Sequence, residues 1–78
     1  MTPEEAIAAL LQARAADATI CPSEAARLMA GAGGDWRTRM DDVHEASGRL
    51  VDAGDVVLSW KGRPLARPEG PYRIGRSR

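Results

Sequence analysis

The stretch "DVVLSWKGRPLARPEGPYRI", residues 55–74, decides the fold of this chain. Residues 56–60 are rich in β-favouring types, "KGRP" (61–64) is typical of a turn, and "PYRI" (71–74) favours a strand again. Three prolines and two glycines between positions 62 and 71 exclude a helix there. The sequence therefore predicts a β-hairpin in which residues 71–74 return beside residues 56–60.

The segment before the hairpin predicts helices separated by one short strand. "TPEEAIAALLQARAA" (2–16) begins with Thr2 as a helix N-cap and has Glu5 at the position that completes a capping box. Residues 19–21 favour an extended backbone, because all three are β-favouring or apolar and a proline follows. That proline opens a second helix over residues 22–29.

The third and longest helix is predicted over residues 36–53. Asp35 is its expected N-cap, and Gly54 supplies the left-handed residue that ends it. Apolar side chains recur every three or four residues in all three helices, which gives each helix one apolar stripe. The core predicted from these stripes and from the hairpin consists of Ile7, Leu10, Leu11, Ile20, Leu28, Met29, Trp36, Met40, Val43, Leu50, Val56 and Leu58.

The predicted order of elements is helix, short strand, helix, turn, helix, strand, loop and strand. Two helices around a glycine-containing turn, followed by a hairpin, are typical of a winged helix-turn-helix. We therefore expect a mainly α, α+β fold with three helices and a two- to three-stranded antiparallel wing sheet. Residues 1–75 are expected to form one winged-helix domain, and residues 76–78 a basic C-terminal tail.

Charge is distributed unevenly along a chain that is formally neutral. Residues 1–55 hold ten carboxylates against five arginines, whereas residues 56–78 hold six basic residues against Glu69 alone. This asymmetry points to a charged partner. Cys21 is the only cysteine, which excludes an internal disulfide and favours a reducing compartment, so we expect a cytoplasmic protein. No run approaches the ~20 apolar residues of a membrane span, and no membrane contact is expected.

Four motifs make the sequence similar to a known family. They are "TICPSEAARLM" (19–29), "WR" (36–37) with Met40 shortly after it, "KGRP" (61–64) and "GPYRI" (70–74). The sequence resembles a family of short, uncharacterised bacterial proteins with a winged-helix fold. The resemblance implies this architecture and carries over no catalytic residue. Winged helices in general often bind DNA, with the third helix in the major groove.

Catalytic and metal sites are not predicted. Cys21 would need His44 beside it to act as a nucleophile, and its place between an isoleucine and a proline favours a small buried side chain. His44 is the only histidine and is better explained as a residue at the margin of the apolar stripe. Asp41 and Asp42 precede no calcium-loop pattern and are better explained as part of a solvated helix face. We expect no enzyme, no cofactor and no metal.

Nucleic acid is the expected partner. Trp36 is expected in the core, whereas Trp60, beside Lys61 at the end of a strand, can either pack on the helices or stay partly exposed. Arg76 and Arg78 are expected in a mobile tail. The residues predicted to contact nucleic acid lie on the wing and on the first turn of the third helix: Lys61, Arg63, Arg67, Arg73, Arg37 and Thr38.

The far side of the third helix opposes this prediction. It carries the carboxylates of Asp41, Asp42, Glu45 and Asp52, which phosphates would repel in a major groove. Two hypotheses therefore stand. The domain binds nucleic acid weakly through its basic wing, or it is a protein-interaction or self-associating module in which an acidic third helix meets a basic wing.

Overall fold

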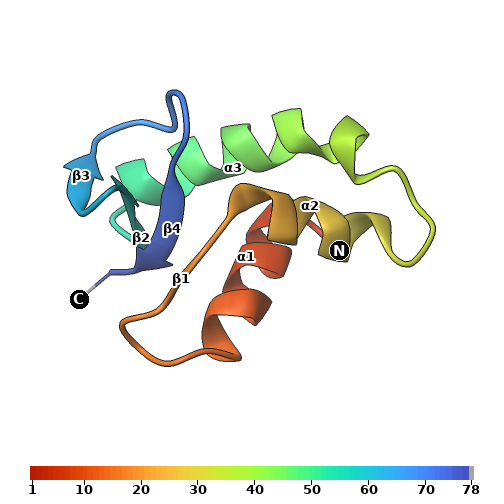
Figure 1. Cartoon of the computed structure of the whole chain (residues 1–78), viewed down its shortest axis with the longest axis horizontal. Coiled ribbons are helices and arrows are strands. Elements are labelled where there is room, and N and C mark those ends of the chain that lie inside the picture. Colours follow the sequence, from red (N-terminus) through yellow and green to blue (C-terminus); the bar gives the residue numbers. More distant parts are fainter. Residues whose placement is uncertain (78) are drawn as a thin grey trace.

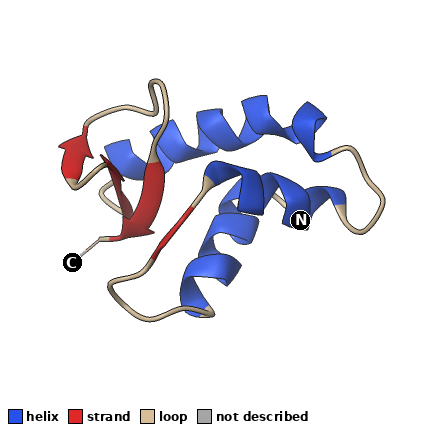
Figure 2. Ribbon diagram, viewed as in Figure 1, coloured by secondary structure: helices blue, strands red, loops and turns tan. Residues whose placement is uncertain are grey.

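Three helices and four strands form an α+β fold, as the sequence predicts (Figures 1 and 2). The structure is a computed structural model that describes residues 1–77. A 3₁₀ turn (η1) leads into the third helix. In chain order the elements are α1 (Pro3–Gln12), β1 (Thr19–Ile20), α2 (Pro22–Ala30), η1 (Trp36–Arg39), α3 (Met40–Asp52), β2 (Val56–Trp60), β3 (Arg63–Leu65) and β4 (Arg73–Arg76).

The sheet has the strand order β1-β4-β2-β3, and every neighbouring pair is antiparallel. It has four strands where two or three were predicted. The extra edge strand, β3, forms where "KGRP" predicts only a turn. Pro64 is tolerated there because an edge strand does not need every backbone N–H for pairing. At the opposite edge β1 pairs with β4, which ties the N-terminal half of the chain to its last strand.

The core lies between one face of this sheet and the three helices. Leu58 pairs with Ile74, and Ile74 pairs with Ile20, so these three side chains share the inner face and are fully or almost fully buried. They meet Ile7 and Leu11 of α1 and small or branched residues of α2 and α3. Figure 1 shows the sheet at one end of the molecule, with α3 extending away from it beside α2 and α1.

Most of the predicted core is confirmed, with one error. Half of the predicted residues are buried, and Leu10, Met29, Trp36, Met40 and Leu50 pack against that buried cluster. The prediction is wrong for Leu28, because 41% of this residue is exposed to solvent. The buried face of α2 is centred between Ala25 and Ala26, which rotates Leu28 toward solvent. Six further buried hydrophobic residues are absent from the predicted core: Ala6, Ala25, Ala26, Ala46, Tyr72 and Ile74.

The predicted helix ends are largely confirmed. Thr2 Oγ1 accepts a hydrogen bond from the Glu5 N–H (3.1 Å), and Glu5 accepts one from the Thr2 N–H (2.8 Å). These bonds lower the pKa of the Glu5 carboxyl. Asp35 caps η1 rather than an α-helix, because the first four residues of the predicted third helix are 3₁₀. Gly54 follows α3 with a φ of 78°, as expected for a left-handed terminating residue.

The last strand begins and ends two residues later than predicted, at Arg73–Arg76 instead of residues 71–74. Arg76 belongs to β4 and is half-buried, so it does not begin a mobile tail. Its guanidinium donates to the Leu11 carbonyl at the end of α1, through Nη2 at 2.6 Å and Nε at 3.2 Å, and to the Arg14 carbonyl at 3.3 Å. The Leu11 carbonyl also accepts the Arg14 N–H (3.2 Å), so Arg76 adds a further donor at the end of the helix and connects β4 to it. Arg78, the other predicted tail residue, lies outside the described residues.

Two glycine substitutions test this packing in opposite directions. A Cβ at Gly34 would lie 2.3 Å from the Ala30 carbonyl oxygen, so Gly34→Ala should destabilise the fold by about 1–3 kcal/mol. Gly48 lies inside α3, and a Cβ there would meet Pro68 at an ordinary 3.8 Å. Gly48→Ala should therefore stabilise by about 0.5–1 kcal/mol through helix propensity. Urea denaturation measures both values. A neutral Gly34→Ala or a destabilising Gly48→Ala would contradict the packing described.

Candidate nucleic-acid interface

The hairpin formed by β2 and β3, together with the loop that follows β3, presents three free cations. Lys61, Arg63 and Arg67 are exposed, and within residues 1–77 none lies within salt-bridge distance of a carboxylate. Arg14 and Arg49, by contrast, pair with Glu24 and Glu4. The hairpin therefore carries the unneutralised charge that the sequence places in this part of the chain.

The turn that carries Lys61 is strained. Trp60 pairs with Arg63, so Lys61 and Gly62 alone form the loop, and both have positive φ angles (51° and 79°). This is the geometry of a type I′ turn, which strongly favours Asn-Gly, Asp-Gly or Gly-Gly. A lysine in the left-handed region is uncommon. Its presence costs backbone energy, and strain of this kind concentrates at functional positions.

Arg73 does not join this exposed group. It lies in β4, half-buried, and its guanidinium donates to Thr19 Oγ1 (2.6 Å), to the Thr19 carbonyl (3.1 Å) and to Cys21 Sγ (2.9 Å). These contacts connect β4 with β1 and with the start of α2. Although the sequence predicts phosphate contact, the structure places Arg73 within the fold as a connector.

The first turn of the third helix holds the other two predicted contact residues. Thr38 Oγ1 donates to the Asp35 carbonyl (2.8 Å), which uses its only proton. The guanidinium carbon of Arg37 lies 4.6 Å from the centroid of the Trp36 ring, and that of Arg27 lies at the same distance. Cation–π contacts at this distance hold both guanidinium groups in place. Arg27 was not predicted here, because eight residues, including a glycine-rich turn, separate it from Trp36.

A cleft of about 320 Å³ opens between the hairpin, the start of α2 and α3; we call it the hairpin cleft. Trp60 lines it and is 39% exposed. Cys21 and His44 line it too, so the structure brings to one cleft the two residues that nucleophilic catalysis would require. No aspartate or glutamate is among the described residues that line it: Cys21, Pro22, Ser23, Met40, His44, Trp60, Gly70, Pro71 and Tyr72.

A chain of hydrogen bonds fixes one side of the hairpin cleft. Ser47 donates to the Val43 carbonyl (2.8 Å), so the Tyr72 hydroxyl donates to Ser47 (3.2 Å). Tyr72 is 3% exposed, and its burial raises the pKa of the phenol. Since the tyrosine proton is used, its oxygen accepts from His44 Nδ1 at 2.7 Å. Nε2 is then the remaining polar atom of the histidine ring.

The hairpin cleft continues into the Arg27–Trp36–Arg37 cluster. Ser23 in the cleft and Arg27 in the cluster are four residues apart in α2, so they share a face of that helix. Met40 and Trp36 are likewise one turn apart at the start of the third helix, and η1 packs against α2. One surface therefore runs from the hairpin through the cleft to this cluster, with cations at both ends.

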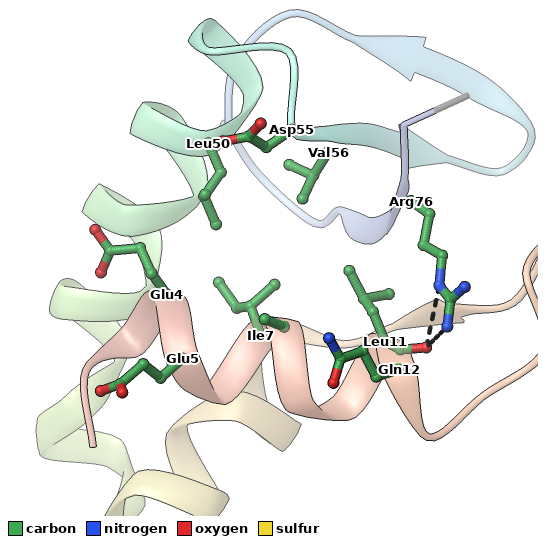
Figure 3. Close-up of a pocket in the computed structure, with 10 residues that line it drawn as sticks. Glu4, Glu5, Ile7, Leu11, Gln12, Leu50, Asp55, Val56 and Arg76 are labelled. Atoms are coloured by element: carbon green, nitrogen blue, oxygen red, sulfur yellow. Dashed lines mark hydrogen bonds between the residues drawn. The ribbon is translucent and has the colours of Figure 1, made fainter.

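A second, larger cleft has the opposite charge. It measures about 570 Å³ and lies between α1, the end of α3 and the strands (Figure 3). Ile7, Leu11, Leu50 and Val56 point into it. Glu4, Glu5 and Asp55 stand at its edge, while Arg76 is occupied by its bond to Leu11. We call this the acidic cleft, because its rim repels phosphate.

The exposed face of α3 is acidic, as the sequence predicts. Asp41, Asp42, Glu45 and Asp52 are all exposed, with Arg49 paired to Glu4 beside them. A helix with this face would meet repulsion from the phosphates that border a major groove.

Comparison with known proteins assigns the chain to a family. The model of the family described as "Protein of unknown function (DUF3253)" matches residues 2–77, and the chain belongs to this family. No curated protein matches it significantly. Across residues 1–77, no helix is both long and apolar enough to cross a bilayer, and no three metal-ligating side chains converge.

Lys61→Asn tests the strain in the hairpin turn. Asparagine adopts the left-handed region more readily than lysine, so this variant should be about 0.5–1 kcal/mol more stable than the parent. Gly62→Ala places a Cβ on a residue with φ of 79° and should destabilise by about 1–2 kcal/mol. Thermal unfolding of both variants is the measurement. A lower melting temperature for Lys61→Asn would show that the turn is not type I′.

Proposed function

We propose that this protein is a non-enzymatic winged-helix domain that binds nucleic acid through phosphate contacts, in the cytoplasm. One observation carries the proposal: Lys61 and Arg63 lie beside Trp60, which lines a cleft without carboxylates, and Arg27 and Arg37 lie within four residues of the lining residues Ser23 and Met40. Two helices around a glycine-rich turn, followed by a hairpin, support the winged-helix assignment. The family supplies no activity, so the proposal rests on this site.

The binding mode differs from major-groove recognition. Because α3 exposes Asp41, Asp42 and Glu45, it would stay outside the groove while the hairpin and the η1 turn contact the backbone. Phosphate contacts carry no base information, so such binding has little sequence preference. Its affinity at physiological salt should be about 10⁻⁴–10⁻⁶ M, the range of non-specific complexes.

Salt dependence measures the number of phosphates contacted. With about three to five contacts, log K against log[salt] should have a slope near −3 to −4 on duplex DNA. In the double variant Lys61→Asn/Arg63→Gln, the magnitude of this slope should fall by about 1.5–2. Binding should weaken equally for every DNA sequence. Fluorescence anisotropy with labelled duplexes over a range of salt concentrations gives both values. The asparagine keeps the turn, so this loss reports charge.

A matched control distinguishes the effect of where the positive charges lie from the effect of the net charge of the protein. Arg14→Gln/Arg49→Gln removes the same two positive charges, but these arginines are paired with Glu24 and Glu4, whereas Lys61 and Arg63 have no carboxylate partner among residues 1–77. Binding by this control should stay within about twofold of the parent. Equal weakening by both double variants would mean that binding follows overall charge. If no nucleic acid binds at about 50 mM salt, where electrostatic attraction is strong, the proposed function is wrong.

The acidic cleft favours one second candidate, a self-associating module. Its apolar floor and acidic rim suit a cationic segment that carries an apolar side chain, and the hairpin of a second copy, with Trp60 beside Lys61, has this chemistry. Sedimentation velocity at low and high salt tests it. Self-association that weakens with salt and disappears in Asp55→Asn/Glu5→Gln supports this candidate, and a monomer at all concentrations rejects it.

A further inference from the structure

We infer that the hairpin cleft receives an unpaired base, stacked on Trp60, so that the protein prefers single strands to duplex; this inference rests on the proposed function. A base within a duplex has both faces covered by its neighbours and cannot offer one to a side chain. A base in a single strand can leave its stack and lie on an aromatic ring.

Trp60 is the aromatic residue with a free surface. The chain has two tryptophans, one tyrosine and no phenylalanine. Tyr72 is buried under the hydrogen bonds described above, and Trp36 packs against the core beneath two guanidinium groups. Trp60, at the end of β2, is 39% exposed and lines the cleft. Its backbone pairs with Arg63 across a two-residue turn, which sets the direction in which the ring leaves the strand.

The composition of the cleft suits a base better than a phosphate. Pro22, Met40 and Pro71 give it apolar walls, and its volume of about 320 Å³ leaves room for one planar base. His44 lines the cleft with Nδ1 engaged by Tyr72, so a neutral ring keeps Nε2 as an acceptor for an N–H on a base edge. Aromatic stacking with one polar contact resembles the general way in which unpaired bases are held.

Charge around the cleft fits a strand that crosses it. Lys61 follows Trp60 in the chain and Arg63 pairs with Trp60 across the turn, while Arg27 and Arg37 lie about one helical turn from the lining residues Ser23 and Met40. A strand with its base on Trp60 therefore has a cation for the backbone on each side. Asp41 follows Met40 and Glu69 precedes Gly70, and both of these neighbours line the cleft. The two carboxylates repel a phosphate backbone, so the expected affinity stays weak.

The test compares a labelled oligothymidylate with a duplex of equal length at about 50 mM salt. The single strand should bind more tightly and quench tryptophan fluorescence. Trp60→Ala should weaken single-strand binding about 5- to 100-fold, the effect of one lost stacking contact, and leave duplex binding within about twofold. Trp60→Phe should restore part of the single-strand affinity, which shows that an aromatic ring is required.

Val57→Ala is the matched control, because Val57 is an apolar residue of the same strand, 49% exposed and outside the hairpin cleft. It should leave both affinities unchanged. If single strand and duplex bind equally and Trp60→Ala changes neither, the base-binding inference is wrong while the proposed function stands. If neither ligand binds the parent protein, the proposed function and this inference fail together.

Discussion

The position of β4 between β1 and β2 is the constraint on which the rest of the structure depends. β4, at the C-terminal end of the described chain, pairs with β1 from the N-terminal half and with β2, which follows α3. It therefore joins the two halves of the chain in one sheet. Arg73 and Arg76 reinforce this closure from the ends of β4, one on Thr19 and Cys21 and the other on the end of α1. Charge-assisted hydrogen bonds of this kind are stronger than neutral ones.

This arrangement divides the basic residues of the C-terminal segment into two groups. Two arginines hold β4 in place, whereas Lys61, Arg63 and Arg67 stay exposed on the hairpin and the loop after it, without a carboxylate partner among residues 1–77. The charge asymmetry of the sequence is therefore only partly a surface property. Lys61 and Arg63 lie beside Trp60, which lines a cleft without carboxylates, while many of the acidic residues lie on α3 and around the other cleft. This segregation is what makes one surface suited to a polyanion.

Sequence patterns predicted the helices and the main hairpin, because capping residues and apolar periodicity are local properties. They failed where tertiary contacts decide. Leu28 has the correct spacing, but the alanines beside it set which face of α2 is buried. No feature of the surrounding sequence distinguishes Arg73, whose N–H groups are hydrogen-bonded inside the fold, from the exposed Arg63. The approach of Arg27 to Trp36 depends on the path of a glycine-rich turn, and a sequence pattern does not fix that path.

The most direct test of the account is the location of the bound strand. Backbone and indole N–H resonances of the ¹⁵N-labelled protein would be followed during titration with a short oligothymidylate. The account predicts the largest shifts at the Trp60 indole, at Lys61–Arg63 and at residues near Ser23, Arg27 and Arg37, with little change around Asp55. Shifts centred on the acidic cleft or on the exposed face of α3 would contradict it.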